Sequence, residues 1–204
     1  MKLNNKRTIL VGLAFLSICA FWQMYDSIVP LILTKTFHMN ETFSGAIMAA
    51  DNILALFLLP FFGSVSDKSH SKLGKRMPFI LFGTGCAIIL MNILPLLDNS
   101  YAAQPSGFKT ASFVIVLGLL LVAMGTYRAP AVALMPDVTP KPLRSRANAI
   151  INLMGAVGGI LYLGVAAVLY PNSKTAGLDH VNYQPLFIVV SAIMFVAVAV
   201  LFLT

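Results

Sequence analysis

Six apolar runs of about 20–25 residues alternate with short polar segments along the 204-residue chain. A helix rises about 1.5 Å per residue, so each run is long enough to cross the roughly 30 Å hydrocarbon core of a bilayer. Because lipid offers no partner for backbone amides, runs of this kind cross it as helices. The pattern predicts an all-α membrane protein with six transmembrane helices and no soluble domain. The predicted spans are residues 9–33, 43–62, 77–97, 111–134, 147–170 and 185–204.

The first apolar run follows Lys2, Lys6 and Arg7, which is also how a secretory signal peptide begins. Small residues near Cys19-Ala20 would then mark the cleavage site. The run continues for more than a turn past that point, however, and five similar runs follow. An uncleaved first helix is therefore the favoured interpretation, with a cleaved signal as the alternative.

The composition agrees with a membrane protein, since 58% of the residues are hydrophobic and only 10% are charged. A soluble domain carries about 25% charged residues. The net charge of +7 does not indicate a nucleic-acid partner, because the bases lie in short segments between apolar runs. Cys19 and Cys86 both fall inside apolar runs and are expected as free thiols.

Basic residues gather on alternate connections, which predicts the orientation of the chain. Ten of them share one side, whereas the other side has only Lys35, Lys109 and Lys174. We expect the basic side to be cytoplasmic, with both termini on it, in a multi-pass protein of the cell membrane. The ten are Lys2, Lys6, Arg7, Lys68, Lys72, Lys75, Arg76, Lys141, Arg144 and Arg146.

Three ionisable residues, Asp26, Asp51 and Arg128, lie inside predicted spans. A charge there costs about 2.5–3.5 kcal/mol on insertion scales, so each should face a partner or a wet cavity. Helical rise puts Asp51 near the midplane and the other two on opposite sides of it. We therefore prefer an Asp51–Arg128 pair. A coupling-ion site, a substrate contact or a gating pair is favoured over a purely structural ion pair.

Aromatic and polar residues accompany these charges. Trp22 and Tyr25 are the aromatics nearest Asp26, and an aromatic ring beside a carboxylate is suited to a sugar. An anchoring role at the membrane interface is the alternative for Trp22. Gln23 and Asn52 lie on stripes of polar and small residues, which also allow close helix packing. We assign Trp22, Gln23, Tyr25 and Asn52 to the candidate substrate and coupling-ion site.

The connection 63–76 carries both signs of charge between two spans. Asp67 precedes Gly74, Lys75 and Arg76 by about seven residues, a spacing that suits a charged latch at the mouth of a moving helix bundle. With Gly63, these residues form the predicted cytoplasmic gating loop. A solvated hairpin without further function is the alternative.

No pattern in the chain indicates catalysis. His70 is expected to be solvated, and His38 and His180 are isolated in the predicted outer connections, so no metal site is expected. There is no phosphate-binding loop, dinucleotide fingerprint or set of nucleophile and base. We therefore expect neither an enzyme nor a cofactor.

Three segments resemble a known family: WQMYDSIVPLIL, ETFSGAIMAADNILALFLLPFFGSVSD and LGKRMPFI. They look like the N-terminal half of a major facilitator superfamily transporter. More narrowly, they resemble the glycoside–pentoside–hexuronide cation symporters and the related sucrose-transporter-like branch. GSVSDKSHSKLGKRMPFI matches the loop motif of that branch, and YRAPAVALMPDVTPKPLRSRANA resembles its fourth-to-fifth-helix segment.

The resemblance implies two inverted three-helix repeats and alternating access to a solute site between two six-helix halves. It would make the first and fourth helices equivalent, in keeping with Tyr25-Asp26 and Tyr127-Arg128 at similar positions in each. It also implies roles for Asp26 and Asp51 in binding sugar and cation. Arg128 stands where melibiose-permease-like members have a carboxylate, which favours protons over sodium.

The sequence therefore predicts a secondary active transporter that moves a glycoside or oligosaccharide with a proton. The resemblance implies twelve helices and this chain has six, so we expect a half-size or truncated transporter that needs a second six-helix half, from a homodimer or a separate chain. There are two alternatives: an inactive or accessory half, or a carrier of a non-sugar solute such as a lipid or drug. No nucleic acid is expected as a partner.

Overall fold

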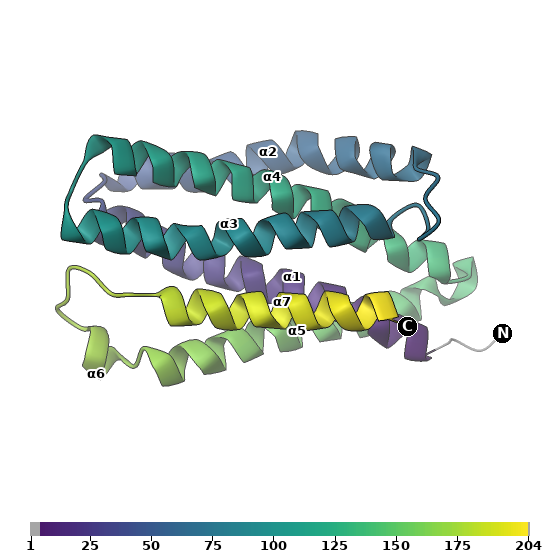
Figure 1. Ribbon diagram of the computed structural model, residues 1–204. Coiled ribbons are helices and arrows are strands. Elements are labelled where there is room, and N and C mark those ends of the chain that lie inside the picture. The colour runs from purple at the N-terminus through teal and green to yellow at the C-terminus, as the bar shows by residue number, and fades with distance from the viewer. Residues whose placement is uncertain (1–4, 204) are drawn as a thin grey trace.

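Six long helices lie side by side in the computed structural model, which describes residues 5–203 (Figure 1). No strand occurs in this range, so the predicted all-α fold is confirmed. Lys2 and Thr204, which belong to the predicted cytoplasmic side and sixth span, fall outside the described residues. The elements are α1 (Asn5–Leu31), its π-helical continuation η1 (Ile32–Thr36), α2 (Glu41–Lys68), α3 (Met77–Ala103), α4 (Gly107–Val138), the 3-10 turn η2 (Lys141–Leu143), α5 (Arg144–Leu169), the short α6 (Asn172–Thr175) and α7 (Gln184–Leu203).

All six long helices are apolar and long enough to cross a membrane. Most of them extend past the predicted apolar runs, because a helix continues into the polar headgroup region for as long as its residues allow. α2 continues through Asp67 to Lys68, and α3 continues to Ala103. Asp98, which directly follows the predicted third span, therefore lies within a helix.

The helices pack in two related groups. α1 packs mainly against α5 and α7, whereas α4 packs mainly against α2 and α3. If α1, α2 and α3 correspond to α4, α5 and α7 in that order, the α1–α5 contact is equivalent to the α4–α2 contact. The α1–α7 contact is likewise equivalent to the α4–α3 contact. This equivalence is the pattern expected of the two three-helix repeats.

Glycines allow the closest helix crossings. A Cβ at Gly158 of α5 would overlap the carbonyl oxygen of Leu16 in α1. A Cβ at Gly83 of α3 would lie 2.6 Å from the backbone nitrogen of Tyr127 in α4. At both crossings one backbone lies against the next, as small residues permit in membrane helices.

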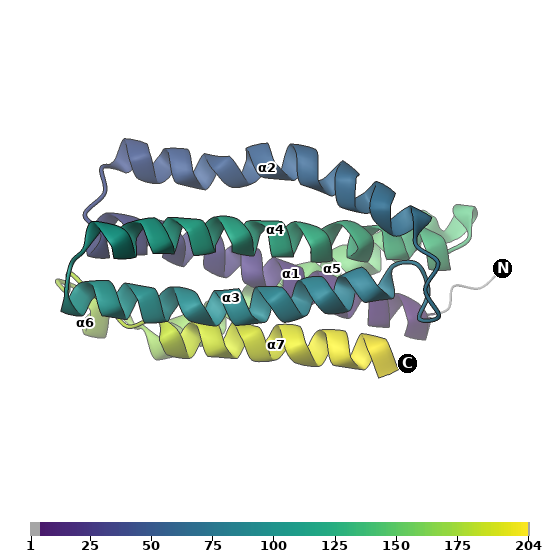
Figure 2. The ribbon, with the colours of Figure 1, turned by 45° about the horizontal axis from the view of Figure 1, so that its top comes forward.

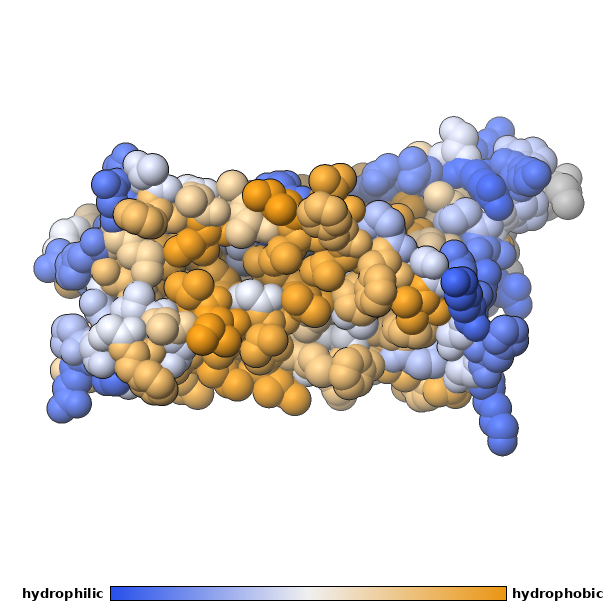
Figure 3. Space-filling model, turned by 90° about the horizontal axis from the view of Figure 1, so that it is seen from above, coloured by the Kyte–Doolittle hydropathy of each residue, from blue (hydrophilic) through white to orange (hydrophobic). Residues whose placement is uncertain are grey.

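The face of the molecule seen in Figure 3 divides into an apolar band and two polar ends. Both ends of the described chain lie at one polar end, together with the α2–α3 and α4–α5 connections (Figures 1 and 2). The basic segments predicted to share a side therefore do share an end of the bundle. η1 and α6 lie at the opposite end.

α1 and α2 differ most in burial. α1 supplies many core residues, whereas only Ser44 and Ser66 of α2 are buried. Figure 2 shows α2 along one edge of the bundle. Polar groups on the inner side of α2 therefore face α1 and α4 across a thinly packed region, and this is where the candidate site lies.

Candidate functional site

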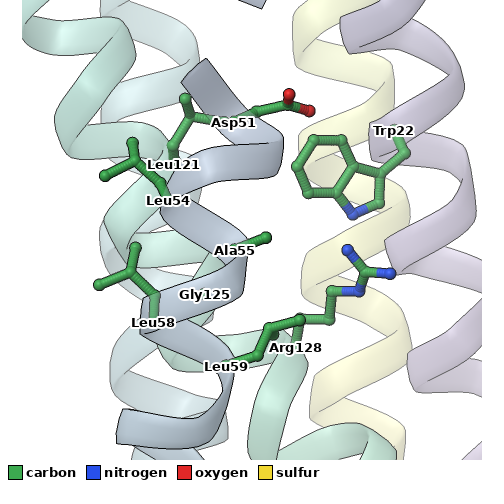
Figure 4. Close-up of a pocket in the computed structure, with 9 residues that line it drawn as sticks. All are labelled: Trp22, Asp51, Leu54, Ala55, Leu58, Leu59, Leu121, Gly125 and Arg128. Carbon is green, nitrogen blue, oxygen red and sulfur yellow. The ribbon is translucent and has the colours of Figure 1, made fainter. Parts of the chain in front are cut away.

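A pocket between α1, α2 and α4 brings together three of the predicted site residues. Trp22 comes from α1, Asp51 from α2 and Arg128 from α4 (Figure 4). The other lining residues are apolar or glycine. The pocket has a volume of about 20 Å³, which is room for about one water molecule. A larger solute does not fit inside the pocket in this arrangement of the helices.

Arg128 interacts with Trp22. Its guanidinium carbon lies 5.5 Å from the centre of the indole ring, within the range of a cation–π interaction. Figure 4 shows the guanidinium and the Asp51 carboxylate both directed toward the Trp22 ring from different helices. Among residues 5–203 no ion pair joins Arg128 to Asp51 or Asp26, so the preferred Asp51–Arg128 pair is not formed.

Asp51 is instead hydrogen-bonded to its neighbour along the chain. The side-chain amide of Asn52 donates to Asp51 Oδ1 at 2.8 Å, and the Asn52 backbone amide also donates to this oxygen. Oδ2 makes no such bond among the described residues and remains available as an acceptor. Asn52 is exposed and supports the carboxylate from outside the pocket.

Two buried donors close to this pocket have no acceptor in the described part of the chain. They are the indole nitrogen of Trp22 and the hydroxyl of Tyr25. Tyr25 does not line the pocket, because it is only 1% exposed and packs between Phe21 and Trp22 in the core. An unpaired buried donor costs about 1–3 kcal/mol, so an oxygen-rich ligand would gain by supplying the missing acceptors.

The remaining predicted site residues lie apart from this pocket. Gln23 lines a second pocket, of about 330 Å³, between α1 and α5, together with Cys19, Gly155 and Gly159. Asp26 is exposed, with no ion pair in the described residues. The structure thus brings together Trp22, Asp51 and Arg128, places Gln23 on another side of α1, and leaves Asp26 at the surface.

The predicted gating loop forms a compact charge cluster. Arg76, whose side chain is only 7% exposed, donates to Asp67 at 2.7 Å, to the Ser66 hydroxyl at 3.0 Å and, through Nε, to Asp137. Lys75 lies 3.7 Å from Asp67 and 3.5 Å from Asp137. The cluster therefore ties the end of α2 to the end of α4.

The two glycines of this loop have different roles. Gly74 has φ +89°, a left-handed conformation that favours glycine, and it makes the turn that directs Arg76 back toward α2. Gly63 lies inside α2, where its carbonyl accepts from the Ser66 hydroxyl that Arg76 also contacts. Gly63 thus supports the cluster through its backbone only.

A buried carboxylate at the other end of the bundle was not among the predicted site residues. Asp98 has no exposed surface and lies 3.8 Å from Nδ1 of His180, which in turn contacts the Thr36 hydroxyl and Asn99. The description of His180 as isolated was wrong. Pro105, which follows the last residues of α3, was a signal that the helix extends past Asp98.

Comparison with known proteins identifies the family. The family model described as Major Facilitator Superfamily matches residues 11–204, nearly the whole chain. The chain therefore belongs to the major facilitator superfamily, a class of transport proteins, and it is a multi-pass membrane protein with six membrane-spanning helices.

Several curated relatives are sucrose transport proteins. The chain is 35% identical to sucrose transport protein SUC3 of Arabidopsis thaliana over 72% of its own length, and 36% identical to sucrose transport protein SUT3 of Oryza sativa subsp. indica over 69%. It is 25% identical over 86% of its length to alpha-ketoglutarate permease of Escherichia coli. The matched regions cover 26%, 30% and 38% of these relatives, so the chain spans well under half of their length.

Proposed function

We propose that this chain forms part of a secondary active transporter that carries a glycoside or oligosaccharide together with a proton by alternating access. It acts as a carrier and not as an enzyme, in the cell membrane, with both termini cytoplasmic. The observation that carries the proposal is the meeting of Trp22, Asp51 and Arg128 from three helices at one pocket. The similarity to sucrose transport proteins supports a sugar as the solute.

Each member of this trio suits part of a sugar. The apolar face of a pyranose can stack on the Trp22 ring, as sugars do on aromatic side chains. The Asp51 carboxylate can accept bonds from hydroxyl hydrogens, and the Arg128 guanidinium can donate to hydroxyl or ring oxygens. The unpaired indole nitrogen of Trp22 is a further donor at a site that favours an oxygen-rich molecule.

Proton coupling is assigned to Asp51 and Asp26. Asp51 lies on the second helix, and its carboxylate is paired with no base in the described residues. A proton on it removes an uncompensated charge from the membrane region, which allows the helices around it to rearrange. Asp26, exposed on α1, is the second candidate carboxylate.

The charge cluster at the basic end serves as a cytoplasmic gate. Closing requires α2 and α4 to come together, and Arg76 joins Asp67 of α2 to Asp137 of α4. Opening at that end would separate these groups. The complete solute path needs a second six-helix half, supplied by another copy or by another chain.

A solute that is itself an acid is the second candidate, and Arg128 favours it. The guanidinium has no carboxylate partner among residues 5–203, and Arg binds carboxylates with two parallel hydrogen bonds. A relative named alpha-ketoglutarate permease, 25% identical to this chain, supports this candidate more weakly than the sucrose transport proteins support a sugar. In this alternative Trp22 and Arg128 hold the acid, and Asp51 repels it until protonated.

The binding test uses Trp22, which is the only tryptophan in the sequence. Sucrose added to the purified protein should shift the indole fluorescence, because the sugar replaces water beside the ring. Arg128→Lys should weaken binding roughly 10–100-fold, since a hydrogen bond to a charged group contributes about 1.5–3 kcal/mol. Arg146→Lys, an exposed arginine outside the pocket, is the matched control and should bind as the unaltered protein does.

The outcomes separate the candidates. A response to 2-oxoglutarate but not to sucrose would replace the sugar proposal by the acid one. No response to either would favour an accessory half without a solute site of its own.

Coupling is tested in proteoliposomes that contain the protein and any required second half. Asp51→Asn and Asp26→Asn are compared with the unaltered protein for proton uptake on addition of sugar. Loss of proton uptake with sugar binding retained is the expected result for the coupling carboxylate. Proton uptake that survives both substitutions would rule out these two residues.

A further inference from the structure

A carboxylate is fully buried at the end of the bundle opposite the termini, away from the candidate solute site. Asp98 lies near the end of α3, its side chain has no exposed surface, and the polar groups beside its carboxylate are the Thr36 hydroxyl and the His180 ring. An ionised carboxylate in such a place is costly unless a positive charge or a proton compensates it. His180 is the base nearest to it, 3.8 Å away.

The hydrogen bonds around His180 determine which ring nitrogen carries hydrogen. Asn182 Oδ1 accepts from the backbone amide of Gln184 at 2.9 Å and from the side-chain amide of Asn99 at 3.0 Å. Asn99 therefore presents its own carbonyl oxygen to His180 Nε2, at 3.0 Å, so that Nε2 must donate. Only Nδ1 is left to gain or lose a proton.

Nδ1 faces both Asp98 and the end of the first helix. It lies 3.8 Å from Asp98 Oδ2 and 3.2 Å from the Thr36 hydroxyl. With a proton on Nδ1 the imidazolium compensates the buried carboxylate. With the proton on Asp98, the Thr36 hydroxyl donates to a neutral Nδ1 and no charge is buried. Both arrangements contain one proton.

We propose that Asp98 and His180 form a proton-binding site that holds one proton between the carboxylate and Nδ1, and that this proton locks η1 to α3 and to the α6–α7 connection. The site spans these three elements through Thr36, Asp98 and His180. It does not depend on the solute or on the coupling carboxylates of the proposed transport mechanism.

The local backbone at the lock is irregular. η1 is π-helical, a rare form that is frequent at functional sites, and His38 just after it has φ +50°, which is uncommon for a residue other than glycine. A pocket of about 220 Å³ beside the lock is lined by η1, the end of α3 and the α6–α7 connection. Solvent reaches His180, whose side chain is 30% exposed, but does not reach Asp98.

Other titratable groups face the site without pairing with Asp98. The only ion pair of Asp98 within the described residues is with His180. Lys109 is engaged by the carbonyls of Ser100 and Gln104. The groups on the surrounding elements are Lys35, His38, Tyr101, Lys109, Asp179 and Tyr183.

Alkaline pH should therefore release the lock. Removing the single proton leaves Asp98 ionised beside a neutral imidazole, and the buried charge is relieved only if η1 or the connection moves to admit water. At acid pH a second proton makes the pair positively charged. This charge costs less free energy than the buried carboxylate does, because His180 already contacts solvent. The pair thus favours the closed arrangement at neutral pH and loses it as pH rises.

Hydrogen exchange of the backbone amides of residues 32–39 tests this in the purified protein. Two of these amides make inter-residue bonds that opening would break, from Phe37 to Ile32 and from Met39 to Leu33. Variants are compared at the same pH, so the chemical pH dependence of exchange cancels. At about pH 9 the unaltered protein should exchange roughly tenfold faster than Asp98→Asn, and at about pH 6 the two should agree.

His180→Gln gives the opposite shift. It keeps a side-chain amide for Asn99 but removes the imidazole, so faster exchange should already appear near pH 7. His38→Gln, a nearby histidine outside the pair, should follow the unaltered protein, and the amides of α5 should stay protected in all variants. Identical pH profiles for the unaltered protein, Asp98→Asn and His180→Gln would overturn the proposal, whatever solute the protein carries.

Discussion

At the residue scale, single polar groups determine how α1 meets its neighbours. The Tyr127 hydroxyl is fully buried, lies 2.7 Å from the Ser17 hydroxyl and donates to the carbonyl of Ala14 at 3.2 Å. Ser17 has a single hydroxyl hydrogen, which it can donate either to the Ala14 carbonyl at 3.0 Å or to the Tyr127 oxygen. In an apolar interior these bonds join α4 to α1 at one definite height, because any sliding would leave a buried hydroxyl unpaired.

Tyr127→Phe should destabilise the protein by about 1–2 kcal/mol, since one buried donor is lost while Ser17 keeps its bond to Ala14. The thermal unfolding midpoint in detergent should fall by roughly 2–6 °C. Tyr101→Phe is the control, because the Tyr101 hydroxyl is partly exposed and makes no hydrogen bond to a described residue. An equal midpoint for the two variants would show that the Tyr127 bonds contribute nothing net.

The sequence predicted which kinds of residue belong to the site, but not which side chains they contact. An arginine and carboxylates inside apolar runs indicated a wet interior, and the structure does place Asp51 and Arg128 in one pocket. The partner of Arg128 proved to be the Trp22 ring instead of a carboxylate. Helical rise gives the depth of a side chain but not its direction around the helix axis, which depends on packing.

At the scale of elements, the crossing of α1 and α5 depends on Gly158. The backbone of Leu16 fills the space that a side chain at this position would need, and the backbone cannot give way as a flexible side chain would. Gly164 in the same helix has open space around it. The two glycines therefore form a matched pair in one element.

Gly158→Ala should force α1 and α5 apart and cost about 1–3 kcal/mol, the usual range for overpacking a tight contact. Gly164→Ala should be neutral or slightly stabilising, because alanine favours helix by up to about 1 kcal/mol over glycine. Thermal unfolding of both variants in the same detergent measures the difference. A Gly158→Ala protein as stable as Gly164→Ala would contradict the close backbone approach.

The charge cluster around Arg76 is a second feature that holds two helices, α2 and α4, together. Arg76→Gln should cost about 1–3 kcal/mol, because Asp67, Asp137 and Ser66 lose a charged donor. The connection 69–76 should then be cleaved faster by proteinase K, as α2 separates from α4.

Lys72→Gln is the control within the same connection, since Lys72 is exposed and has no ion pair in the described residues. Its cleavage rate should match that of the unaltered protein. If proteinase K cleaved the connection of Arg76→Gln no faster than that of the unaltered protein, the cluster would not hold this end of the bundle closed.

At the scale of the whole molecule, the basic connections share one end and the Asp98–His180 pair lies at the other (Figure 1). The bias of Lys and Arg predicts that the first end is cytoplasmic. With Cys19 and Cys86 replaced, Ser106→Cys should react with an impermeant maleimide on intact cells, whereas Lys72→Cys should react only after permeabilisation. The reverse pattern would invert the proposed orientation.

The sequence by itself determined the number and kind of helices and which connections share an end. Apolar length and the placement of bases are properties of consecutive residues, so both can be predicted without knowing how the helices pack. Tertiary structure alone decided that Arg128 meets Trp22, that Arg76 joins Asp67 to Asp137, and that Asp98 is buried beside His180. Most of these contacts join residues more than sixty positions apart, and they exist only because particular helix faces are packed together.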